Sequence, residues 1–131
     1  MIVDTSAIVA ILNKEHERAS FIAAIAGADR VAMSAGSWIE LSAVISHRFP
    51  DMSVGEADRF RLAMRIEIAA VTPRQAQIGY KAYRDYGRRA AGPAKLNVGD
   101  CFAYALAIDT GEPLLFKGDD FIHTDVRRAL P

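Results

Sequence analysis

The stretch Met1-Ile2-Val3-Asp4-Thr5-Ser6-Ala7-Ile8-Val9-Ala10-Ile11-Leu12 places two apolar segments on either side of a polar turn that carries an acid. The pair Ile2-Val3 is too short for a helix, whereas the apolar run from Ala7 to Leu12 has helical length. Between them, Asp4 and Ser6 are residues that favour the start of a helix. We therefore expect a short strand, a tight turn and a helix.

The rest of the chain continues this alternation of short apolar runs and helical segments. Strands are predicted at 30–33, 68–71 and 114–116, and helices at 19–27, 38–49, 54–67, 74–91 and 98–109. Ser53 and Glu56 have the spacing of a capping box, and Asn97 is a good N-cap. After residue 117 we expect a loop and at most a terminal helix. Short apolar runs separated by helices indicate an α/β fold with a parallel sheet buried on both faces.

Composition sets limits on function. The 131 residues suit one domain over 1–131, and 16 basic and 16 acidic residues leave no net charge, so attraction to nucleic acid needs a local patch. The single cysteine, Cys101, lies in an apolar stretch and is expected in a buried helix face. There is no basic and apolar leader at the N-terminus and no apolar run of about 20 residues. We expect a cytoplasmic protein without a membrane segment.

Two acids follow predicted strands, where open parallel sheets bind their ligands. Asp4 comes directly after Ile2-Val3, and Asp119 follows the last strand after Lys117-Gly118. Each acid also has a structural explanation, because Asp4 can cap a helix and Asp119 can be a turn residue.

Two further acids lie in predicted helices. Glu40 is flanked by apolar residues, and a carboxylate in such a place needs a partner, which a metal ion would supply. Arg48 is two turns away and pairs poorly by local helix geometry, and the alternative is a partly exposed helix edge. Asp100 lies in the first turn after Asn97, where the helix dipole stabilises an acid. Ala103 and Ala107 on the same face are small enough to bring this helix close to other elements.

Taken together, these segments resemble the PIN-domain family, and most closely its VapC toxins. The resemblance spans nearly the whole chain and is carried by residues 1–7, by Ser37-Trp38-Ile39-Glu40-Leu41-Ser42, by residues 96–107 and by Pro113-Leu114-Leu115-Phe116-Lys117-Gly118-Asp119-Asp120-Phe121. It implies an α/β/α fold around a short parallel sheet. It also implies an endoribonuclease that depends on Mg²⁺, or alternatively Mn²⁺, is held inactive by a VapB-type antitoxin and forms a homodimer.

The resemblance also assigns residues. Asp4, Glu40 and Asp100 fall on the family's three most regular acidic positions, and Asp4 and Asp100 are the first choice for direct metal contact. The fourth position is occupied by Gly118, and acids follow it at 119 and 120. We choose Asp119 as the fourth catalytic acid and keep Asp120 as the alternative.

A basic segment precedes Asp100. Its members, Arg84, Arg88, Arg89 and Lys95, are answered locally only by Asp85, so they are candidates for guiding the RNA backbone. Tyr83 and Tyr86 are candidates for stacking on unpaired bases. A solvated helix face with core tyrosines explains the same pattern equally well. The three histidines, His16, His47 and His123, show no ligand spacing and are expected at the surface.

Two other classes of function share parts of this pattern. A phosphoryl receiver also has an acid after its first strand, but it needs another after the central strand, where this chain has Thr72-Pro73. A haloacid-dehalogenase-like phosphotransferase needs a second Asp where Ser6 lies. The remaining alternative is a non-catalytic PIN-like module that binds RNA or protein.

Overall fold

Four parallel strands form one sheet in the computed structural model, which describes residues 1 to 131. The strands are β1 (Ile2–Val3), β2 (Val31–Ser34), β3 (Ile66–Ala69) and β4 (Leu114–Leu115), and their order across the sheet is β3-β2-β1-β4. Ile2 is paired with Ala32 on one side and with Leu114 on the other. The predicted parallel sheet is therefore confirmed.

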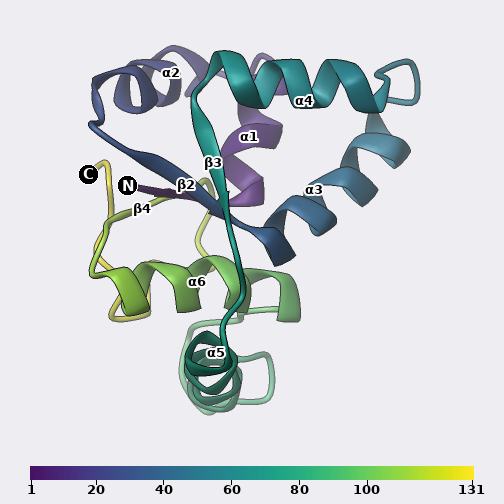
Figure 1. Cartoon of the computed structure of the whole chain (residues 1–131). Helices are drawn as coiled ribbons and strands as arrows, with labels where there is room; N and C mark the ends of the chain where they lie inside the picture. The colour runs from purple at the N-terminus through teal and green to yellow at the C-terminus, as the bar shows by residue number, and fades with distance from the viewer.

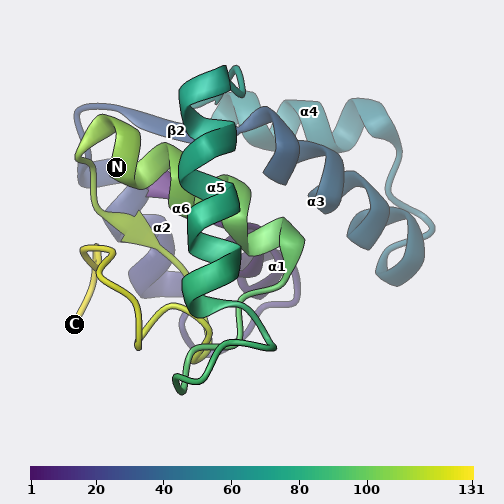
Figure 2. The same cartoon turned by 90° about the horizontal axis from the view of Figure 1, so that it is seen from below.

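Helices cover both faces of this sheet. Figure 1 shows α1, α2 and α4 above the sheet, α3 to its right, and α6 and α5 below it. Their bounds are α1 (Thr5–Leu12), α2 (Arg18–Gly27), α3 (Ala35–Arg48), α4 (Val54–Ala63), α5 (Pro73–Tyr86) and α6 (Val98–Thr110). Seen from below in Figure 2, α5 lies over α6, which separates it from the sheet. The arrangement is the three-layer α/β/α fold expected from the sequence.

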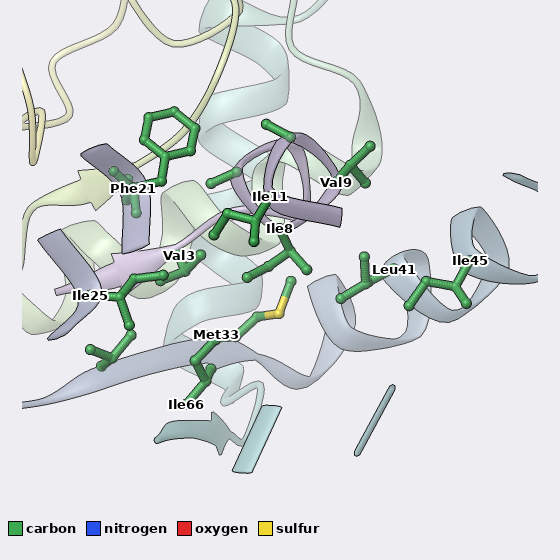
Figure 3. Packing of buried hydrophobic residues seen from close by; sticks show 14 residues of the cluster. Val3, Ile8, Val9, Ile11, Phe21, Ile25, Met33, Leu41, Ile45 and Ile66 are labelled. Carbon is green, nitrogen blue, oxygen red and sulfur yellow. The ribbon is translucent and has the colours of Figure 1, made fainter. Parts of the chain in front are cut away.

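The side chains of the strands alternate between two cores, as the two-residue period of a strand requires. Val3 and Met33 point to the upper core, where they pack with Ile8 of α1 and Leu41 of α3 (Figure 3). Ile2 belongs to the lower core. This core also contains Ala32, Leu96, Ala103, Tyr104, Leu106, Leu114 and Phe121. Small residues in α6 let this helix lie close under the strands.

Two predicted helix ends are wrong, and backbone geometry explains both. α4 ends at Ala63 rather than near 67, because Arg65 takes a positive φ of 53° that breaks the helix, and β3 therefore starts at Ile66. α5 ends at Tyr86 rather than near 91, because Gly87 is extended and forms a bridge with Leu96. The segment after 117 consists of turns and contains no helix.

The helix starts agree better with the sequence. Ser53 and Glu56 form the predicted capping box, and Asn97 caps α6. Cys101 is buried, as expected, and burial raises the pKa of its thiol to about 11. None of the helices is long and apolar enough to cross a membrane.

The carboxyl ends of β1 and β4 lie side by side, because the Asp4 amide donates to the Leu115 carbonyl at 2.9 Å. This edge of the sheet carries the candidate site.

Candidate active site

Asp4 lies at the junction of β1 and α1 and is almost fully buried. One carboxylate oxygen, Oδ2, accepts hydrogen bonds from the Ser6 amide at 2.8 Å and from the Ser6 hydroxyl at 2.6 Å. The Ser6 hydroxyl is itself fixed, because it accepts a bond from the Lys117 amide at 3.0 Å. The other oxygen, Oδ1, is buried without any hydrogen-bond partner. Asp4 therefore caps α1 with Oδ2, and its Oδ1 remains available to bind another group.

Glu40 reaches the same place from α3. The Thr5 hydroxyl donates to its Oε2 at 2.7 Å and orients the carboxylate toward the start of α1. Its other oxygen, Oε1, lies against Gly99, and a Cβ built at Gly99 would overlap the carboxylate. The absence of a side chain at residue 99 is thus what allows α3 to bring Glu40 so close to α6.

Asp100 enters from the first turn of α6. Its Oδ2 accepts a hydrogen bond from the Asn97 amide at 2.7 Å, while the Asn97 side chain accepts one from the Asp100 amide at 2.9 Å. This reciprocal pair is a capping box. The structural role that the sequence suggested for Asp100 is therefore present, together with a position beside the other acids.

These three acids line one cleft of about 330 Å³. The cleft is bounded by Asp4, Thr5, Ser6, Val9, Glu15, Glu40, Val44, Arg48, Asn97, Asp100, Lys117 and Asp120. Asp120 is among these residues and Asp119 is not. Asp119 starts a turn with its carbonyl oxygen, which accepts from the Ile122 amide at 3.3 Å. The structure thus places the alternative fourth acid, rather than the preferred one, beside the cluster.

Two of the clustered acids have strongly raised pKa values. Burial raises the pKa of Asp4 to about 6, against the opposing effect of the Ser6 hydrogen bonds, and the charge of Glu40 raises it further. Burial is also the main cause for Asp100, whose pKa rises to about 7, with the charges of Asp4, Asp120 and Glu40 acting in the same direction. Carboxylates that are buried together destabilise one another when ionised, and they favour a cation between them.

The oxygen ligands of the cleft fit an open magnesium site better than a closed site in which protein side chains surround the ion. No group of three or more His, Cys, Asp or Glu side chains has the geometry to enclose an ion. Magnesium does not need such a group, because it binds through one or two carboxylates and keeps several waters. The unpartnered Oδ1 of Asp4, buried in a cleft of carboxylates, is the atom that such an ion would satisfy.

The basic and aromatic candidates lie elsewhere. Arg84, Arg88, Arg89 and Lys95 are exposed, and none of them lines the cleft. Arg84 pairs with Asp85 at 3.0 Å. Tyr86 is half-buried and packs on Tyr104 with ring centroids 5.9 Å apart, which is the core role given as the alternative. Tyr83 is 44% exposed. The three histidines are exposed, as predicted.

Several residues of the site were missed by the sequence analysis. Lys117 and Gly99 lay there only within the segments that carry the family resemblance. Arg48 was considered solely as an ion-pair partner for Glu40. For Arg48 a signal was available, because residues 40, 44 and 48 repeat at the spacing of one helix face.

Comparisons with known proteins identify the family. The family model described as "PIN domain" matches residues 1–127. A VapC ribonuclease of Mycobacterium bovis and ribonuclease VapC28 of Mycobacterium tuberculosis are each 46% identical over 130 residues, which cover 99% of this chain and 98% of theirs.

Solved structures show the same fold. VapC20 of Mycobacterium tuberculosis, described as a toxin that cleaves the sarcin-ricin loop, superposes with a TM-score of 0.72 at 18% identity, over 96% of this chain and 98% of that one. A chain of a toxin-antitoxin complex from Klebsiella pneumoniae gives a TM-score of 0.68 at 18% identity, over 95% and 92% of the two chains. From the match over almost its entire length, the chain belongs to the PIN-domain family and, within it, to the VapC ribonucleases.

Proposed function

We propose that this protein is a magnesium-dependent endoribonuclease that hydrolyses RNA phosphodiester bonds and acts as the toxin of a VapBC-type toxin–antitoxin pair. The observation that carries the proposal is the cleft in which Asp4, Glu40 and Asp100 meet, with one buried carboxylate oxygen left without a partner. A cluster of acids with only a structural role gains nothing from a buried carboxylate oxygen that has no partner. A cluster that binds a cation gains a ligand for that cation.

Asp4 and Asp100 would hold the metal, and Asp120, rather than Asp119, would complete the acidic set. Bound Mg²⁺ supplies positive charge for the phosphate and lowers the pKa of water. Mn²⁺ accepts the same oxygen ligands and would serve in its place.

The chain's own residues position these groups. Ser6 fixes one oxygen of Asp4 through two hydrogen bonds, which leaves the other oxygen pointing to a defined place. Thr5 holds Oε2 of Glu40, so that Oε1 remains to orient an attacking water. Neither hydroxyl is assigned as a nucleophile, because each holds a carboxylate in place and no histidine lines the cleft to complete a Ser-His-Asp set. Water is therefore the group that attacks phosphorus.

The names of the relatives support the RNA substrate and the antitoxin partner that we propose for this protein. They are called ribonucleases, and one fold neighbour comes from a toxin-antitoxin complex. We infer that RNA is the substrate and that a VapB-type antitoxin binds this chain in the cytoplasm. Large exposed apolar side chains, among them Ile39, Val54 and Leu62 on α3 and α4 and Tyr80 and Val98 on α5 and α6, leave area for an antitoxin and for a second copy of the chain.

The test is cleavage of a labelled single-stranded RNA by the purified protein. We expect cleavage in Mg²⁺, none in EDTA, and recovery when Mg²⁺ or Mn²⁺ is added in excess. Glu40→Gln should reduce the rate at least tenfold, while Glu67→Gln, a surface acid that pairs with Arg30, should not change it. Binding of RNA without cleavage under every metal condition would favour the non-catalytic module instead.

A further inference from the structure

Two cations line the otherwise acidic cleft, and neither has a role in the metal site. They are Arg48, at the end of α3, and Lys117, after β4. RNA has to bring a chain of negative phosphates into a cleft that contains five carboxylates, and the protein as a whole carries no net positive charge to attract it. The substrate therefore needs local positive charge at the cleft itself.

Arg48 lies on the same face of α3 as Glu40. Residues 40, 44 and 48 are spaced by four, and all three line the cleft. Eight residues of helix place Arg48 about 12 Å along the axis from Glu40. The Arg48 side chain is exposed and forms no hydrogen bond or ion pair within the chain. Its guanidinium is therefore available to a phosphate that lies beyond the reacting one.

Lys117 also lines the cleft, but its ammonium group already has partners. Its ammonium group donates to Glu15 and lies 3.2 Å from Glu17. These hydrogen bonds raise the pKa of Lys117, led by the bond to Glu15, so the side chain stays charged. Lys117 thus holds a full positive charge that Glu15 and Glu17 neutralise in the free protein.

Glu15 is close to both cations. Its hydrogen bond with Lys117 is the main cause of its lowered pKa, and the charge of Arg48 acts in the same direction. It comes from the turn between α1 and α2, where its amide donates to the Ala10 carbonyl at 3.0 Å. The backbone is therefore fixed, and only the side chain would have to move away from the cations.

We propose that Arg48 and Lys117 together bind the RNA phosphate next to the one that is cleaved, and that the carboxylate of Glu15 occupies this phosphate position until RNA displaces it. The proposal rests on the proposed ribonuclease function and adds the substrate-binding residues to it. The Glu15 carboxylate is paired with Lys117 and lines the same cleft as Arg48, so it can substitute for the anionic group of the substrate.

A purely structural explanation makes different predictions. If the Lys117–Glu15 pair only fastened β4 to the α1–α2 turn, removing either partner would lower stability to a similar extent and leave RNA affinity alone. If Glu15 competes with phosphate, the two changes must have opposite effects on RNA affinity. Lys117→Met should weaken binding, and Glu15→Gln should strengthen it.

The experiment measures the affinity of a fluorescent single-stranded RNA by anisotropy in EDTA, across a salt series. The variants are Arg48→Ala, Lys117→Met and Glu15→Gln. The controls are Arg30→Ala and Glu67→Gln, which break an exposed pair made by residues that do not line the cleft. Thermal melts of every variant report its folding.

We expect Arg48→Ala and Lys117→Met each to raise Kd roughly tenfold and to reduce the slope of log K against log salt by about 0.7. Glu15→Gln should lower Kd several-fold, and the controls should leave it unchanged. In Mg²⁺, the Lys117 variant should show a raised KM with kcat within about twofold of the wild type.

An unchanged Kd in Lys117→Met, or weaker binding in Glu15→Gln, would overturn the phosphate site while wild-type cleavage continued. A wild-type protein that fails to cleave RNA in Mg²⁺ would instead overturn the ribonuclease function, and the phosphate site with it.

Discussion

Replacing Asp100 by Asn should make the metal-free protein more stable at pH 8, although a hydrogen-bonded carboxylate is being removed. Asp100 is 7% exposed and its pKa is raised to about 7, from an ordinary value of 3.8. The difference of about three units corresponds to roughly 4 kcal/mol of destabilisation when the group is ionised in the fold, as an upper bound. Asn keeps the acceptor for the Asn97 amide and removes the charge.

The sign of the pH dependence follows from the raised pKa. Between pH 4 and 7 the folded protein binds a proton at Asp100 that the unfolded chain does not, so wild-type stability in EDTA should rise as the pH falls through this window. Asp4, with a pKa raised to about 6, adds a second proton below that value. The advantage of Asp100→Asn should therefore be full above pH 7 and disappear near pH 4.

Magnesium provides the second half of this test. A ligand that binds only the folded state stabilises it by RT ln(1 + [L]/Kd), about 2.7 kcal/mol at a hundredfold excess over Kd. Asp100→Asn should gain much less than the wild type, because one of the proposed ligands is lost.

Thermal and urea melts in EDTA and across a magnesium series make these measurements. The matched control is Asp109→Asn, which lies on the same helix but pairs with Arg74 at 2.6 Å. This control should not be more stable than the wild type in EDTA, and it should retain the full magnesium response. Equal magnesium responses in Asp100→Asn and wild type, with no gain in stability at pH 8, would mean that Asp100 only caps α6.

Three further predictions concern the cleft and its surroundings. Asp120→Asn should reduce RNA cleavage at least tenfold and Asp119→Asn should leave it within twofold, because only residue 120 lines the cleft; the reverse order in a cleavage assay would restore the sequence-based choice. Gly99→Ala should reduce cleavage at least tenfold by displacing the nearby glutamate, while the free energy of unfolding changes by no more than about 1 kcal/mol, and undiminished cleavage would contradict this. Arg88→Ala combined with Arg89→Ala should flatten the salt dependence of RNA binding, and an unchanged slope would leave these arginines as solvated loop residues.

Local signals explain how far the sequence predicted the fold. The capping residues Ser53 and Asn97 marked helix starts correctly, because a cap depends on contacts three residues apart. The ends of α4 and α5 were misplaced, because they depend on a positive φ at Arg65 and on a bridge from Gly87 to Leu96. Neither of these is visible in a run of apolar letters.

The same distinction between local signals and contacts made only in the folded chain applies to the candidate site. Asp4, Glu40 and Asp100 could be selected because each acid is unusual in its own segment, after a strand, among apolar residues or at a helix start. The sequence favoured Asp119 over Asp120, but the turn between these neighbouring residues decides which side chain lines the cleft, and in the structure it is Asp120. The contact of Lys117 with Glu15 joins positions 102 residues apart, and only the folded chain brings them together.

The central claim is that a carboxylate-bound metal at Asp4 drives RNA cleavage, and the most direct measurement compares Asp4→Asn with the wild type. Both proteins would be purified alike, checked for folding by thermal melts in EDTA, and assayed on labelled single-stranded RNA in Mg²⁺, with Asp109→Asn as the control. We predict that Asp4→Asn folds but cleaves at least about a hundredfold more slowly than the wild type, whereas the control is unaffected. Folded Asp4→Asn protein that cleaves RNA at the wild-type rate in Mg²⁺ would contradict the account.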